Sequence, residues 1–66
     1  MTAQEAINKS LAEDRTVALD FDARVLDELL GETHDYVGNA YCWQFWGEDT
    51  RGKSWHIRMN HPRTST

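Results

Sequence analysis

The chain has 66 residues, a formal net charge of −4 and a single cysteine. This length supports one domain, residues 1–66, and a domain this small buries only about 60% of its unfolded surface. One cysteine excludes an internal disulfide, so the three tryptophans, two tyrosines and two phenylalanines are expected to supply most of the buried area. No run of about 18 apolar residues is present, which excludes a membrane-spanning helix.

Charge is distributed unevenly along the sequence. Residues 1–50 contain all 11 acidic residues and three basic ones, a net charge of −8, whereas residues 51–66 contain four basic residues and no acid. The two halves either neutralise each other in the fold or form surfaces of opposite charge. The N-terminus lacks the basic and apolar segments of a signal peptide, which together with the free Cys42 predicts a cytoplasmic protein.

A first helix is predicted over residues 3–12. Thr2 and Glu5 have the spacing of a capping box, in which Thr2 is the N-cap and Glu5 the third helical residue. Apolar residues then recur at three- and four-residue spacing and form a narrow stripe: Ala3, Ala6, Ile7 and Leu11. A stripe this narrow favours a helix at the edge of the domain.

A strand and a second helix follow. Residues 16–21 alternate between apolar and polar side chains, which is typical of a strand. Asp20 or Asp22 can cap a helix over residues 23–30, and Gly31 suits the left-handed residue that ends it. The predicted buried face of this helix consists of Val25, Leu26, Leu29 and Leu30. Residues 32–39 are rich in loop formers and are predicted as a connection.

The segment Tyr41–Met59 predicts a β-hairpin with a defined register. Its loop, Asp49–Lys53, fits a type I turn followed by Gly52 in the left-handed conformation. One face then receives the pairs Gly47/Trp55, Phe45/Ile57 and Trp43/Met59, and the other receives Trp46/His56 and Gln44/Arg58 together with Cys42. A slip of one residue would scatter the apolar side chains over both faces, so turn and pattern agree on one register.

These elements predict a small α+β domain of order α-β-α-β-β, with a three-stranded sheet and both helices on one face. The apolar sheet face is expected to contain Val17, Leu19, Phe21, Trp43, Phe45, Trp55, Ile57 and Met59. The first strand could pair antiparallel with the final strand or parallel with the Tyr41–Gly47 strand, and the antiparallel arrangement is favoured slightly. Residues from about 60 to 66 lack apolar side chains and are predicted to form a frayed tail.

The exposed hairpin face is the predicted partner-binding site, with its contact centre at Gln44, Trp46, His56 and Arg58. Trp and Arg are enriched in binding hot spots, and a sheet holds them rigidly. Trp46 and Arg58 are diagonal neighbours in this register, close enough for a cation–π contact. The alternative is a purely structural role, in which Trp46 only strengthens the hairpin or the loop at 32–40 folds over it. We therefore expect a cytoplasmic protein-binding domain, monomeric or a small homo-oligomer, of a size seen among bacterial and phage regulatory or inhibitor proteins.

Two other binding functions remain open. Trp46, His56 and Arg58 with the basic C-terminal segment could bind nucleic acid by stacking and phosphate contacts, although the sequence pI of about 5.1 argues against it. The acidic half, including Asp27 and Glu28, could instead imitate DNA towards a basic partner, although such charges usually form a solvated face.

Catalysis, metal binding and cofactors are not predicted. The spacing of Cys42, His34, His56 and His61 resembles no zinc motif. No base is placed beside Cys42 to activate it as a nucleophile, and a domain this small has little room for a ligand pocket of about 300 Å³. The protein is therefore not expected to be an enzyme.

Overall fold

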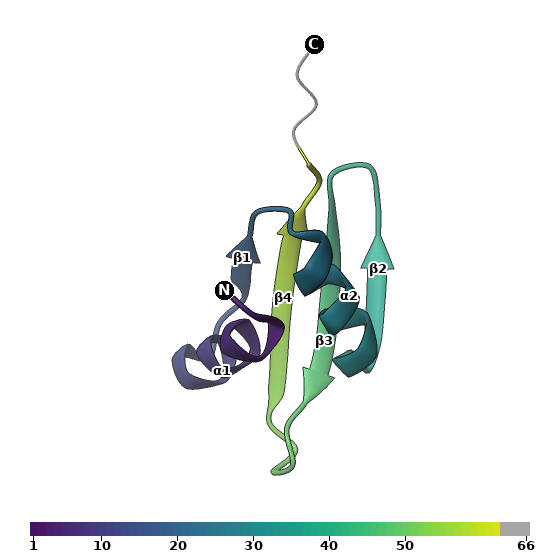
Figure 1. The fold of residues 1–66 in the computed structure, drawn as a ribbon. Helices are drawn as coiled ribbons and strands as arrows, with labels where there is room; N and C mark the ends of the chain where they lie inside the picture. Colours follow the sequence, from purple (N-terminus) through teal and green to yellow (C-terminus); the bar gives the residue numbers. More distant parts are fainter. Residues whose placement is uncertain (63–66) are drawn as a thin grey trace.

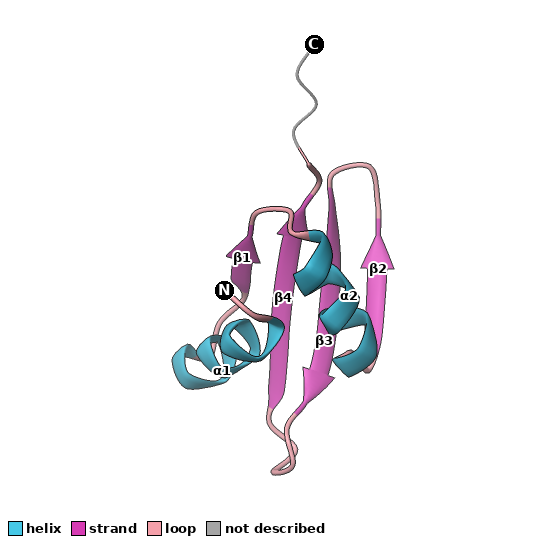
Figure 2. Ribbon diagram, in the orientation of Figure 1, coloured by secondary structure: helices cyan, strands magenta, loops and turns pink. Residues whose placement is uncertain are grey.

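Two helices cover one face of a mixed four-stranded sheet (Figure 1). The structure is a computed structural model that describes residues 1–62, and its sheet has the strand order β1-β4-β3-β2. Figure 2 shows the same arrangement by secondary structure. The elements are α1 (Ala3–Glu13), β1 (Val17–Leu19), α2 (Ala23–Glu32), β2 (Asp35–Gly38), β3 (Cys42–Glu48) and β4 (Ser54–Asn60). The predicted α+β class is confirmed, and the predicted three-stranded sheet has one strand too few.

Both helices begin at the predicted caps. Thr2 Oγ1 accepts a hydrogen bond from the Glu5 N–H at 3.1 Å while Glu5 Oε1 accepts from the Thr2 N–H, which completes the capping box. Asp22 caps α2 by accepting from the N–H groups of Arg24 and Val25.

The predicted end of α2 at Gly31 is wrong. Gly31 lies inside α2, which continues to Glu32 and ends at the cap residue Thr33. Gly31 has no positive φ, and Gly52 is the glycine of the described chain that has one, so no left-handed stop forms at position 31. After Thr33 the chain enters the sheet, where the His34 N–H donates to the backbone oxygen of Trp46 at 2.8 Å and the Thr33 hydroxyl lies 2.9 Å from the same oxygen.

The β3–β4 hairpin has the predicted register. Gly47 pairs with Trp55, Phe45 with Ile57 and Trp46 with His56. Gly52 has a φ of 80°, and its N–H donates to the Asp49 carbonyl at 3.0 Å. The Asp49 carboxylate closes the turn by accepting from the backbone N–H groups of Arg51 and Lys53.

The segment predicted as a connection contains strand β2, which pairs antiparallel with β3. This extra strand explains a second correction, the direction of β1. The chain reverses at each hairpin, so adding β2 turns β4 parallel to β1 instead of antiparallel to it. The final strand is the neighbour of β1 in the favoured prediction and in the structure, and only its direction was wrong.

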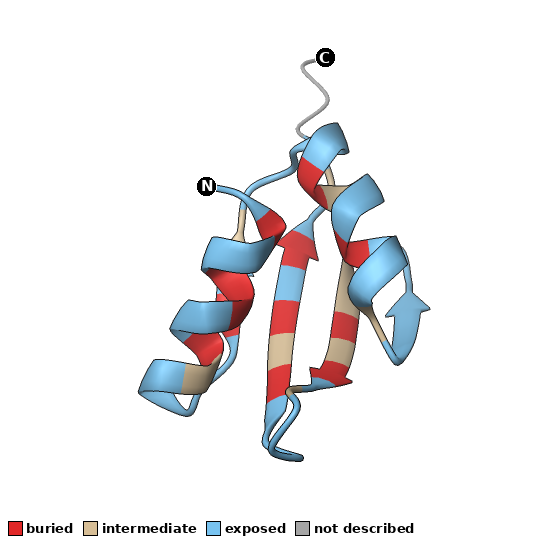
Figure 3. Cartoon of the chain, turned by 60° about the horizontal axis from the view of Figure 1, so that its bottom comes forward, coloured by how far each residue is buried: buried red, intermediate tan, exposed pale blue. Residues whose placement is uncertain are grey.

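The core lies between the two helices and the central strands β4 and β3 (Figure 3). Val17, Phe45, Trp55, Ile57 and Met59 are buried as predicted, together with residues of both helices: Ala3, Ala6, Ile7, Val25 and Leu29. Leu19 and Trp43 pack partly buried against this cluster, whereas Phe21 and Leu30 are 37% and 44% exposed and depart from the prediction. Neither helix of residues 1–62 has the length and apolar character to cross a bilayer.

Trp55 packs directly over a glycine of the neighbouring strand. A Cβ built on Gly47 would lie 2.2 Å from Cζ2 of the Trp55 indole, closer than real Cβ atoms approach another atom. The indole is buried, with 3% of its surface exposed. Glycine at this position therefore lets a large ring lie flat against the backbone of β3.

The C-terminal segment continues β4 and contacts the sheet beyond it. β4 ends at Asn60, and the His61 ring stacks on Trp43 with ring centroids 4.1 Å apart. His61 Nε2 also forms a hydrogen bond of 2.7 Å with the backbone oxygen of Asn39. The predicted tail therefore starts no earlier than Pro62, and residues 63–66 lie outside the described residues.

Candidate functional site

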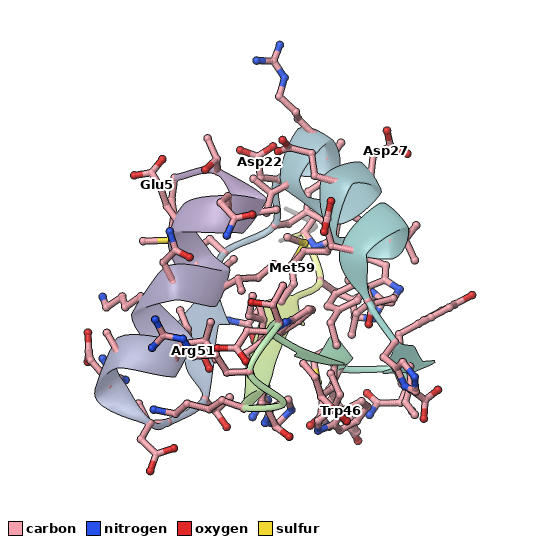
Figure 4. The ribbon with its side chains drawn as sticks, turned by 90° about the horizontal axis from the view of Figure 1, so that it is seen from below. Glu5, Asp22, Asp27, Trp46, Arg51 and Met59 are labelled. Atoms are coloured by element: carbon pink, nitrogen blue, oxygen red, sulfur yellow. The ribbon has the colours of Figure 1, made fainter. Side chains whose placement is uncertain are left out.

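The sheet face opposite the helices carries the predicted contact residues. We call it the open face, defined by Gln44, Trp46, His56 and Arg58, whose side chains alternate with the buried ones along β3 and β4. Seen from below, Trp46 lies on the side of the sheet away from α1 and α2 (Figure 4). β2 extends this face, because it sets Val37 opposite Gln44. The segment 32–40, which was predicted as a loop and contains β2, thus lies beside β3 in the sheet.

A flat ring stack occupies the centre of the open face. The rings of Trp46 and His56 are 4.8 Å apart between centroids and 7° from parallel. Both side chains are half-buried, whereas Arg58 is exposed. The ring that contacts the face of Trp46 is therefore the imidazole of His56, directly across the strand pair, and Arg58 lies at the rim.

Two neighbours hold the His56 ring in one orientation. Nε2 lies 3.0 Å from Oε1 of Gln44, and Nδ1 lies 2.6 Å from the hydroxyl of Thr16. An amide oxygen only accepts, so Nε2 carries the proton and Nδ1 accepts from Thr16 in the neutral ring. Gln44, His56 and Trp46 therefore form one connected rigid group.

The backbone beneath this group is fixed by α1. The Ser10 hydroxyl accepts from the His56 N–H at 3.0 Å and donates its one proton to the backbone oxygen of Arg15 at 2.7 Å, with the backbone oxygen of His56 also within 3.2 Å. Ser10 is only 2% exposed and is the buried polar residue of the described core. β4 extends past the start of β1 at His56. There the Ser10 hydroxyl bonds to the backbone groups that a neighbouring strand would otherwise pair with.

Partial burial lowers the pKa of His56 below its usual value. The unfolded chain therefore binds this proton at a higher pH than the folded protein does. The resulting stabilisation is complete above the ordinary histidine pKa of about 6.5 and is lost as the pH falls through that value towards the folded-state pKa. The neutral ring that joins Gln44 to Thr16 is thus the form that folding favours.

We expect His56→Gln to reduce the loss of stability that the wild-type protein shows on acidification from about pH 7.5 to about pH 5. Urea unfolding at several pH values would measure this difference. The matched change His34→Gln, at an exposed ring, controls for the removal of a histidine. A His56→Gln protein with the full wild-type acid sensitivity would contradict the assignment.

A shallow hollow opens beside the ring stack. Its volume is about 220 Å³, and its lining includes Trp46, His56, Thr16, Arg15 and Ser54. The hollow joins the open face to the end of α1 and has both apolar ring surface and hydroxyl groups.

The other polar candidates do not converge. Within residues 1–62, no three His, Cys, Asp or Glu side chains come together as a metal site would require. Cys42 is buried and pairs with Asn60 at the far end of the hairpin from His56. The His61 ring stacks on Trp43 and forms a hydrogen bond with the backbone oxygen of Asn39.

Within residues 1–62, the acidic and basic halves of the sequence are not joined by ion pairs. In the described part of the chain the ion pair is a local one, between Arg15 and Glu13 at 2.6 Å. Lys53 instead donates from Nζ to the carbonyl of Leu11 near the C-terminal end of α1, at 2.7 Å. The contact between the two halves at this point is therefore a hydrogen bond to the backbone and not an ion pair.

Ser10 and Thr16 are the site residues that sequence reasoning missed. Their contacts with His56 span 46 and 40 residues along the chain. A hydroxyl residue near a helix end gives no signal of such a distant partner. A comparison with protein-family models, curated proteins and solved structures gave no significant match for this chain.

Proposed function

We propose that this chain is a small protein-binding domain that docks a partner protein on its open face, in a regulatory or inhibitory role. The observation that supports this most directly is the Trp46–His56 stack, held by Gln44 and Thr16 on the sheet face away from α1 and α2. Fixed aromatic side chains lose little conformational freedom on binding, which favours affinity.

The arrangement has the composition of a binding hot spot. Half-buried Trp46 is at its centre, exposed Arg58 at its rim, and the hollow beside the stack offers a place for one side chain of the partner. Exposed Val37 extends the apolar part of the surface towards β2. We place the protein in the cytoplasm, since Cys42 is a free thiol.

Trp46→Ala is expected to abolish capture of the partner and to lower the free energy of unfolding by only about 1 kcal/mol, from the lost ring stack. Affinity capture from the native host, followed by mass spectrometry, would measure the first effect and urea unfolding the second. The matched control is Tyr41→Ala, at a residue that is 79% exposed and directly precedes β3. Capture that survives Trp46→Ala would refute docking on the open face.

Imitation of DNA is a second candidate, favoured by the absence of ion pairs for Asp27 and Glu28 within residues 1–62. Neutralising both carboxylates as Asp27→Asn and Glu28→Gln would weaken capture of a basic partner in that case and leave docking on the open face unchanged. Nucleic-acid binding would show as a salt-dependent gel shift, and no shift at about 50 mM salt would dismiss it.

A further inference from the structure

The outer edge of β2 is a surface separate from the open face. β2 ends the sheet, and all four of its residues are exposed (Figure 3). The opposite edge, β1, has only three residues and begins at buried Val17. β2 is therefore the edge that another strand could approach.

The backbone of β2 presents unused hydrogen-bonding groups at this edge. The Asn39 N–H donates to the Cys42 oxygen at 3.0 Å, and this bond fixes the alternation along the pair of strands. Asp35 and Val37 therefore direct their backbone groups towards β3, whereas Tyr36 and Gly38 direct theirs outwards. These outward groups have the spacing that an added strand requires.

β2 is short and begins with an acidic residue, but it lacks three other features that often protect an edge strand. The sequence Asp35–Gly38 contains no lysine, no proline and no bulge against β3. Its two large side chains are half-exposed, Tyr36 at 53% and Val37 at 47%, and they lie on opposite faces of the sheet. An added strand could therefore gain main-chain hydrogen bonds and an apolar contact on each face.

Charge indicates which kind of strand fits. No lysine or arginine occurs between Arg24 and Arg51, a stretch that includes α2 after its second residue and all of β2 and β3. The same stretch contains six carboxylates, namely Asp27, Glu28, Glu32, Asp35, Glu48 and Asp49. Asp35 is the first residue of β2 and Glu32 is the last residue of α2, and both are exposed.

A second copy of the chain fits this edge poorly. Pairing two β2 strands would bring together two copies of the same acidic stretch, and like charges oppose such an association. We propose that the β2 edge binds an extended basic segment of another protein by strand addition. The segment continues the sheet beyond β2, and its lysine or arginine side chains lie near Glu32 and Asp35.

The test uses a blocked hexapeptide of alternating lysine and valine as the probe, with NMR detection on the full chain. Exchange of the Tyr36 and Gly38 amide protons is expected to slow at least about tenfold at saturating peptide, because both N–H groups become hydrogen-bonded. The Trp46 indole signal is expected to stay in place, which separates this edge from the open face. The same peptide with glutamate in place of lysine is expected to leave exchange unchanged.

Two pairs of variants test the contribution of the backbone hydrogen bonds and the contribution of charge separately. Tyr36→Pro removes an outward N–H and is expected to weaken peptide binding about tenfold, whereas Tyr36→Thr removes the ring and keeps the N–H. Asp35→Lys is expected to weaken binding several-fold, and Glu13→Lys makes the same charge change on α1 as its control. Amide exchange in the free proteins verifies that each variant is folded.

Three results would overturn the proposal. The first is unchanged exchange at Tyr36 and Gly38 when the basic peptide is present. The second is equal binding of the glutamate peptide. The third is protection of both amides without peptide that increases with protein concentration, which would identify a second copy as the occupant.

Discussion

Gly47→Ala is expected to lower the free energy of unfolding by about 3 kcal/mol. The added methyl group would occupy the space of the Trp55 indole, since its Cβ would lie 2.2 Å from Cζ2 and 2.5 Å from Cε2. Neither atom is the end of a flexible chain. The indole must therefore leave its buried position or force β3 and β4 apart. Urea unfolding followed by tryptophan fluorescence would measure both the stability and the change around Trp55.

Gly31→Ala provides the matched control. A Cβ at Gly31 has no atom within 4 Å, and Gly31 lies within α2 without a positive φ. The same chemical change is expected to stabilise the protein there by about 0.5–1 kcal/mol, because alanine is the better helix former. Equal effects at both positions would show that the buried position of the Trp55 indole does not require glycine at position 47.

Ser10→Ala is expected to lower the free energy of unfolding by about 2 kcal/mol. The change removes one hydroxyl and leaves the N–H and the oxygen of His56 without this partner, together with the oxygen of Arg15. The loss is large for a single hydroxyl because Ser10 is buried and water cannot replace it easily. Thermal unfolding by circular dichroism would measure it.

The effect should also reach the open face. With Ser10 gone, the amide proton of His56 is expected to exchange faster, which hydrogen-exchange NMR would detect. Asn8→Ala is the matched control, since Asn8 is exposed on the same helix and bonds only to the exposed Gln4 side chain, at 2.9 Å. If both variants lose the same stability, the contact between Ser10 and β4 does not stabilise the fold.

The hairpin could be predicted in detail because its information is local. Asp49, Gly52 and the alternating residues on either side fix one register, and no distant residue is needed. The caps at Thr2 and Asp22 were recognisable for the same reason, as each acts within three residues of its own position.

β2 could not be predicted from the sequence. Its residues form a strand because they pair with β3, and their composition alone does not indicate one. Of its four residues only Tyr36 and Val37 favour strands, and Asp35 and Gly38 favour turns. Missing β2 also gave the wrong direction for β1. The residue pairs of the open face were predictable from the register, whereas the hydroxyls of Ser10 and Thr16 reach His56 only through the tertiary fold.

The position of β4 in the middle of the sheet has a consequence for biosynthesis. β4 is translated after the other three strands of this sheet, yet it separates β1 from β3 and pairs with both. The strand pairing of Val17 requires Ile57, which is translated forty positions later. Residues 1–53 lack this central strand, so we expect the sheet to form only after β4 has emerged from the exit tunnel.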